Sequence, residues 1–346
     1  MNRWMALVVA VATSLGTTVA AQALPQRVAV DGASGGWIVW SQFNEDFSAA
    51  HLVSARPDGA DVFDVTAEVE GTVDYDPVFS PDGREILFTQ NHQDGSESIA
   101  IVAASGGPIM TIDLGCVDPC AVDDMPNWTP DGQRIVFTRV VGPFDLVNES
   151  AHSAVLWTAN LDGSDVHRFS EPGIDGRFED GHARFSPDGG YVVFERLRNR
   201  DLHVAIFRMQ SDGTNVRQLT RWALHAEMPD LSPAMNGPTR DLVVFETRPT
   251  DAETSRVASV PATCSSVVEC TRRIRYVTPN VTLPDAAFNP AWSPDGRRIA
   301  YVGFNDPGPD DPLIGTIWTV RYDGHHARQV SDGEKFAVRP DWSAAT

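Results

Sequence analysis

The stretch that decides the fold reads Pro77-Val-Phe-Ser-Pro-Asp-Gly-Arg-Glu-Ile-Leu-Phe88. Its centre, Ser-Pro-Asp-Gly, is typical of a tight turn, because Pro presets φ, Asp bonds the local backbone and Gly supplies a positive φ. Apolar, β-branched and aromatic residues on either side favour strands. The stretch therefore predicts a β-hairpin.

The same hairpin recurs along the chain. Further copies lie at 126–137, 183–194, 229–245 (degenerate, with an insertion), 290–301 and 340–343, the last of which is incomplete. An apolar strand pair follows each copy and often turns on Asp-Gly. Each unit is thus four short antiparallel strands. One such sheet cannot bury its faces alone, so we expect the sheets to pack radially around a channel.

The two ends of the chain predict how the ring closes. Residues 36–40 match the second strand of a unit, and residues 51–59 complete that unit, but its first strand is missing. The spare fragment at 340–343 can supply that strand. The sequence therefore predicts an all-β, six-bladed β-propeller of four-stranded blades, in which the N- and C-terminal strands share one blade.

These P-x-[FW]-[ST]-P-D-G units resemble the WD40-like (PD40) repeats of the TolB-like β-propeller family, named after the Tol-Pal protein TolB. The resemblance covers nearly the whole mature chain and implies an envelope binding protein. Similar repeats occur in peptidase propellers and in some polysaccharide-degrading enzymes. Two departures are expected: the α/β domain that precedes the TolB propeller is absent, and there is no room for a hydrolase domain.

The N-terminus predicts export. Arg3 is followed by an apolar run from Met5 to Val11, and small residues lead to Ala21-Gln22-Ala23, an A-x-A cleavage pattern. The run is too short to span a bilayer. We expect a signal peptide at 1–23, with cleavage after Ala21 as the rival, and a single propeller domain at 24–346. The mature protein is then periplasmic or secreted, and monomeric.

Charge excludes some partners. The chain has 47 Asp and Glu against 27 Lys and Arg, a formal net charge of −20. Nucleic acid is not expected as a partner, because phosphate binding needs a basic surface. Anionic membrane surfaces are disfavoured for the same reason, and no later stretch reads as a membrane span.

Four cysteines fall into two close pairs, Cys116 with Cys120 and Cys264 with Cys270. In an exported protein an even count favours disulfides, each of which would staple a loop tip. The alternative is a zinc site, but the pairs lie far apart in the sequence and neither has C-x-x-C spacing.

Some conspicuous residues are explained without a ligand. The turn aspartates recur in every good repeat, so we interpret them as turn caps: Asp82, Asp131, Asp188 and Asp295. The G-x-S-x-G match at 32–36 lacks the strand and helix of a nucleophile elbow. The insertions at 140–153 and 248–256, with the tip at 264–270, are plausible binding loops.

The residues that enter the innermost strands are better candidates, because they differ between repeats and should ring one mouth of the channel. Directly before the Pro position stand Asp76, Met125, His182, Met228, Asn289 and Arg339. With their neighbours they give a candidate partner or ligand site of Asp74, Asp76, Asp124, His182, His225, Glu227 and Arg339.

Several occupants fit this acidic arc. Carboxylates would hold a hard cation such as Ca²⁺, and His182 with His225 would hold a transition metal. A basic loop of a protein partner would be steered to it. Solvated surface charge is the remaining interpretation. No resident cofactor or metal is assigned.

We favour a non-enzymatic exported protein that binds an envelope protein through this mouth. The alternative is a carbohydrate lyase or hydrolase, with or without a metal. In this enzyme His182 or His225 is the base, Glu227 assists and Arg339 neutralises a uronate. A regulatory ligand-binding module is a third hypothesis that no residue singles out.

Overall fold

The computed structural model describes residues 35–142, 153–171, 177–248, 255–278, 286–305 and 314–344. The expected signal peptide lies outside these residues, as do most of the two insertions at 140–153 and 248–256. Nearly all regular secondary structure of the described residues is strand, which confirms the all-β class. Its two helical segments are the 3₁₀ turn η1 (Trp222–Leu224) and the helix α1 (Val267–Arg273). Neither is long enough to cross a membrane.

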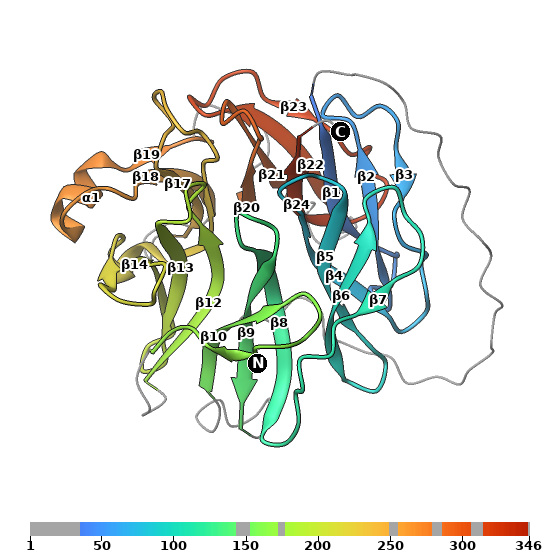
Figure 1. Cartoon of the computed structure of the whole chain (residues 1–346). Helices are drawn as coiled ribbons and strands as arrows, with labels where there is room; N and C mark the ends of the chain where they lie inside the picture. The colour runs from blue at the N-terminus through green and yellow to red at the C-terminus, as the bar shows by residue number, and fades with distance from the viewer. Residues whose placement is uncertain are drawn as a thin grey trace.

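Four sheets each hold four antiparallel strands, and Figure 1 shows them following one another around a ring in chain order. Their strands are β8 (Cys120–Trp128), β9 (Arg134–Val141), β10 (Ser153–Asn160), β11 (His167–Arg168); β12 (Phe178–Phe185), β13 (Tyr191–Arg198), β14 (His203–Gln210), β15 (Arg217–Gln218); β16 (Ala226–Leu231), β17 (Leu242–Thr247), β18 (Arg256–Pro261), β19 (Arg275–Tyr276); β20 (Ala286–Trp292), β21 (Arg298–Asn305), β22 (Ile314–Arg321) and β23 (Arg328–Gln329).

A fifth sheet holds eight strands and both ends of the described chain. It comprises β1 (Trp37–Phe43), β2 (Ala50–Ala55), β3 (Phe63–Asp64), β4 (Val73–Phe79), β5 (Glu85–Asn91), β6 (Glu97–Ala103), β7 (Met110–Thr111) and β24 (Ala337–Ser343). Strand β24 pairs antiparallel with β1, so the expected pairing of the terminal strands is confirmed. One parallel pair, Ala50 with Val73, joins the two halves of the sheet. The blade count of six stays a prediction, because the described strands group into five sheets.

The first strands of the repeats surround the centre of the ring. They contact one another in a closed cycle of β4, β8, β12, β16, β20 and β24, and β24 contacts β4 again. Each pairs with its neighbouring strand through a bulge or irregularity near the Pro position. A bulge twists a strand and re-aims its side chains, and here it positions the candidate site.

The apolar core lies between successive sheets rather than in one central mass. Five of the six clusters in the described residues combine strands of two neighbouring sheets, as where Val78 and Leu87 pack with Trp128 and Phe137, and the sixth lies between the two halves of the eight-stranded sheet. The aromatic residue that ends each hairpin copy is almost fully buried, as is its counterpart in β1: Trp40, Phe88, Phe137, Phe194, Phe245 and Tyr301. The repeat therefore conserves the side chain that seals sheet against sheet.

The Ser-Pro-Asp-Gly turns form as expected. Ser80 donates its hydroxyl to Asp82 over 2.7 Å, and the Arg84 backbone N–H donates to the same carboxylate over 3.1 Å. Corresponding bonds occur at Asp131, Asp188 and Asp295. The interpretation of these aspartates as turn caps is confirmed.

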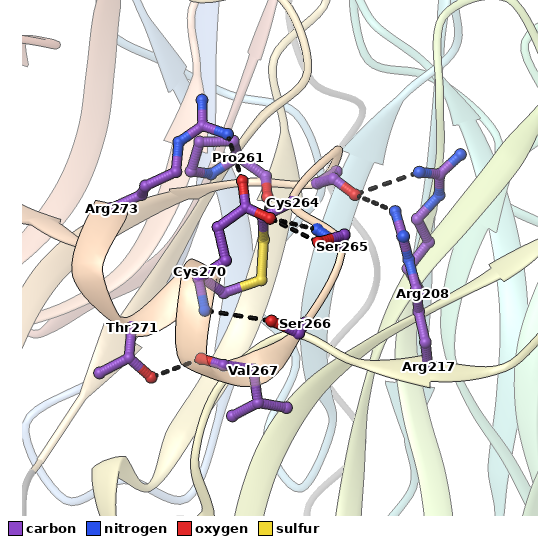
Figure 2. Close-up of a disulfide and its surroundings, with 12 residues drawn as sticks. Arg208, Arg217, Pro261, Cys264, Ser265, Ser266, Val267, Cys270, Thr271 and Arg273 are labelled. Atoms are coloured by element: carbon purple, nitrogen blue, oxygen red, sulfur yellow. Dashed lines mark hydrogen bonds and ion pairs between the residues drawn. A yellow bond between two sulfur atoms is a disulfide. The ribbon is translucent and has the colours of Figure 1, made fainter.

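Both predicted disulfides are present, Cys116–Cys120 and Cys264–Cys270. The second ties the middle of α1 to the segment that precedes it, as Figure 2 shows, and the Ser266 hydroxyl caps the helix by accepting from the Glu269 N–H. Because each sulfur is bonded to another sulfur, none is available as the thiolate that the zinc alternative requires.

Candidate functional site

One residue from each inner strand adopts the left-handed backbone conformation. The six are Asp76, Met125, His182, Met228, Asn289 and Arg339, with φ between 45° and 57°. This conformation is unfavourable for residues with a Cβ and persists where the surroundings hold it. With the residues that follow them, these six line a central cavity of about 30 Å³. That space holds about one water molecule, so side chains fill the channel at this level.

Acceptors on the neighbouring sheet hold this conformation. The backbone N–H of Met228 donates to Glu195 over 2.7 Å, and that of Asn289 donates to Glu246 over 2.9 Å. The Met125 N–H lies 3.3 Å from the Thr89 hydroxyl in the same way. The left-handed turn thus directs these three N–H groups at the preceding sheet.

Glu195 and Glu246 were missed by sequence reasoning, although a signal was present. Each directly follows the buried aromatic of its hairpin, Phe194 or Phe245, where two other copies carry Thr. A carboxylate at that point of a buried strand needs a partner. Burial raises the pKa of Glu246, opposed by the Asn289 N–H and by Arg339.

Arg339 crosses the centre of the ring. Its Nε donates to the Tyr75 hydroxyl over 2.8 Å and lies 3.2 Å from Asp76 Oδ1. Its Nη1 contacts His182 Nε2 at 3.2 Å and the Met228 sulfur, and its guanidinium stacks over the Tyr75 ring. Burial works against the charge, but Asp76 raises the pKa of Arg339, so the guanidinium stays charged.

His182 is held on both ring nitrogens. Its Nδ1 bonds to Glu195, a fully buried carboxylate. Its Nε2 accepts from Arg339 when the ring is neutral and faces Asp76 Oδ2, 3.8 Å away, when the ring is protonated. Burial lowers the pKa of His182, but Glu195 and Asp76 outweigh it and raise the pKa to about 9. The imidazole is therefore engaged in either state.

Three carboxyl groups, Asp76, Glu97 and Asp124, form an acidic set beside the ring, which we call the mouth acids. Asp76 is 8% exposed, and although burial favours its neutral form, Arg339 and His182 hold its pKa below the usual value. Burial raises the pKa of Asp124, and the Asp76 charge adds to this. Burial, Asp124 and Asp76 together raise the pKa of Glu97 to about 8. Asp76 therefore carries its charge, and that charge disfavours the ionisation of Asp124 and Glu97.

The other predicted residues lie apart from the ring. Asp74 is buried and accepts from Thr66 over 2.5 Å and Gln90 over 2.7 Å, and burial raises its pKa. Glu227 pairs across β16 and β17 with Glu246. His225 ends η1, and its ring packs against the ring of His203 at 4.3 Å between centroids.

Sequence reasoning therefore placed Asp76, Asp124, His182 and Arg339 at one centre, and the structure shows them there. Asp74, Glu227 and His225 lie on or beside the surrounding strands. Glu195, Glu246 and Glu97 add three carboxyl groups to this centre that the sequence analysis did not name.

The described residues do not gather these acids into a metal-binding cluster. Among the described residues, one group of potential ligand atoms lies close together, and it comes from Cys116, Cys120 and Asp123. Both sulfurs are in a disulfide, and Asp123 binds Arg139 through two bonds of 2.6 and 2.7 Å. That group is therefore structural, and Ca²⁺ at the mouth stays a prediction.

Comparison with solved structures identifies the fold. The chain superposes on TolB from Acinetobacter baumannii with a TM-score of 0.64 at 20% identity, covering 89% of this chain and 66% of that one, slightly under two thirds. It matches a protein assigned as TolB from Agrobacterium tumefaciens with a TM-score of 0.59 at 17% identity, covering 90% and 99%. The chain has a TolB-like propeller fold.

This TolB-like propeller has wider structural relatives. One is a chain of a nidogen/laminin complex, with a TM-score of 0.56 at 11% identity, covering 90% of this chain and all of that one. No family model matches the sequence, and no curated protein matches it. At these identities the likeness defines the fold, and function has to be argued from the site.

Proposed function

We propose that the ring has six blades. In this interpretation the eight-stranded sheet is two blades, β24-β1-β2-β3 and β4-β5-β6-β7, which meet at the single parallel pair of Ala50 and Val73. The closed cycle of six inner strands supports this count. So does the one left-handed residue in each of those strands.

We propose that the protein is an exported, non-enzymatic binding propeller that receives an envelope or periplasmic protein at the channel mouth. The mouth acids carry the proposal. Burial, Asp124 and Asp76 raise the pKa of Glu97 to about 8, and burial and Asp76 raise the pKa of Asp124, so these carboxylates are costly to ionise together. A Lys or Arg side chain from a partner would relieve that repulsion. The two disulfides fit an oxidising compartment.

The carbohydrate-enzyme alternative finds less support. The central cavity of about 30 Å³ has no space for a sugar ring. Both nitrogens of His182 are engaged by Glu195 and Arg339, so this imidazole is not a free base. His225 packs against His203, away from the residues that line the cavity.

A capture experiment tests the binding role. The mature chain is immobilised and exposed to envelope extract beside a Glu97→Gln/Asp124→Asn variant and a Glu85→Gln control, whose substitution lies at the turn end of β5. We expect one protein to be retained by the wild type and the control, and lost by the variant. Equal retention by all three would refute the site, and specific retention of no protein at low salt would refute the function.

The same complex should depend on pH. Binding of a cationic side chain requires an ionised Glu97, so the affinity should rise from pH 6.5 to pH 8.5, through the pKa of about 8. Isothermal titration with the captured protein measures this. Glu97→Gln should flatten the profile, and a pH dependence that survives this change would assign it to another group.

A further inference from the structure

A second pocket, unrelated to the mouth, lies at the other end of the strands. It has a volume of about 740 Å³, which is in the range of small-molecule sites. The turns at 56–58 and 293–295 line it. The mouth residue Asp124, in contrast, lies on the inner strand β8, before the bulge of that strand. Its apolar wall includes Pro57, Pro294 and Trp342.

Three guanidinium groups line this pocket, from Arg56, Arg298 and Arg328. Asp58 and Asp295 also line it, so three cationic side chains face two carboxylates, and the lining keeps an excess of positive charge in a chain whose formal net charge is −20. They come from sheets that adjoin at the closing point of the ring, Arg56 following β2 and the other two from β21 and β23. The fold therefore assembles the group from distant parts of the sequence.

These cations have incomplete partners. Within the described residues, no carboxylate lies within 4.0 Å of the Arg298 or Arg328 guanidinium. Every side-chain hydrogen bond of Arg298 uses Nη2, which donates to the Thr319 hydroxyl and to the backbone carbonyls of Thr319 and His326. The Arg328 Nη2 donates to the Asp58 carbonyl. The Nε and Nη1 donors of both side chains thus remain for a ligand.

Arg56 adds a buried charge. It is 7% exposed and its guanidinium lies 3.9 Å from the centre of the Trp37 ring. Its Nε has no hydrogen-bond partner, and Asp61 Oδ2 is 3.6 Å away. A buried cation with an unfilled donor is costly without further compensation. Burial lowers the pKa of Arg298. Asp295 opposes this shift, whereas the charges of Arg321 and Arg328 lower the pKa further.

We infer that this pocket binds a small organic or inorganic oxyanion, held by Arg298 and Arg328 at its rim and by the field of Arg56. Guanidinium groups suit this role because they bind carboxylate and phosphate through paired N–H donors. The chemistry shared by both ligand classes is a doubly or triply charged oxyanion. This inference does not rest on the proposed protein-binding function.

Titration calorimetry at low salt tests the inference, with citrate and inorganic phosphate as separate probes of the mature protein. We expect at least one to bind at a single site, and Arg298→Met and Arg328→Met each to weaken it at least tenfold. Arg297→Met is the matched control, because that arginine is adjacent in sequence and does not line this pocket. Citrate binding alone would assign a carboxylate ligand, and phosphate binding alone a phosphate.

Two results would overturn the inference. One is the absence of binding by either probe. The other is an equal loss in the Arg297→Met control, which would indicate general surface attraction. Arg328 is exposed, so its substitution leaves the fold intact and keeps the test valid if Arg298→Met is unstable.

Discussion

Replacing Arg339 with Met tests whether the central ring depends on its guanidinium. The substitution keeps an unbranched stem but leaves Asp76, 8% exposed, with His182 as its nearest cation at 3.8 Å. Removing one partner of a buried ion pair costs about 3–5 kcal/mol. We expect Arg339→Met to lower the free energy of unfolding by that amount at pH 7.

Urea unfolding followed by tryptophan fluorescence measures the loss. The matched control is Arg84→Met, at an ion pair whose arginine side chain is 79% exposed and 3.8 Å from Asp82. Exposed pairs contribute about 0–1 kcal/mol, so the control should change little. In the double variant Asp76→Asn/Arg339→Met part of the stability should return, because the orphaned charge is gone.

The pH dependence gives a further check with a definite sign. The folded-state pKa of Asp76 is depressed, because the cations around it outweigh burial. Its contribution to stability is therefore present above the unfolded pKa and is lost as the pH falls through the folded pKa. The gap between wild type and Arg339→Met should narrow below about pH 4. A loss under about 1 kcal/mol at pH 7, or a double variant less stable than the single one, would refute the reasoning.

Three other predictions concern single features. Gly163→Ala should destabilise the fold by about 1–3 kcal/mol more than Gly95→Ala. Both glycines have a positive φ, but a Cβ at Gly163 would lie 2.1 Å from a backbone oxygen, whereas a Cβ at Gly95 would meet no atom within 4 Å. Equal thermal shifts of the two variants would contradict this. Glu195→Gln should lower the pKa of His182 from about 9, since it removes the largest charge that raises it; an unchanged imidazole titration by NMR would count against the assignment. Replacing both cysteines of the Cys264–Cys270 disulfide with Ala should cost about 2 kcal/mol, as expected for so short a loop, and a variant as stable as wild type in urea would disprove the stapling role.

The sequence was sufficient for the fold because the repeat encodes it locally. Turn chemistry in Ser-Pro-Asp-Gly sets each hairpin, and the aromatic residue at its end, such as Phe137, fills the space between two sheets. The pairing of β24 with β1 followed from counting strands at the two ends. These features depend on short-range rules or on the repeat itself.

The site was less predictable because it depends on contacts between repeats. Alignment on the Pro position found His182 and Arg339, but it could not show that the Arg339 guanidinium would reach His182 and Met228 on two other sheets. His225 lies near the same position in sequence, yet η1 turns its ring toward His203. Side-chain direction around a bulge is set by the neighbouring sheet, which a single repeat does not encode.

The pairing of β24 with β1 also orders events in time. During synthesis, β1 and β2 emerge early, but the inner neighbour of β1 does not exist until residues 337–343 have been made. Until then β1 presents a row of unpaired backbone groups, an edge that invites association with other chains. A contact between residues some 300 positions apart also forms slowly, because the loop it closes is long. Pairing of β24 with β1 therefore converts an open arc with an exposed edge into a closed ring without an exposed edge at that position.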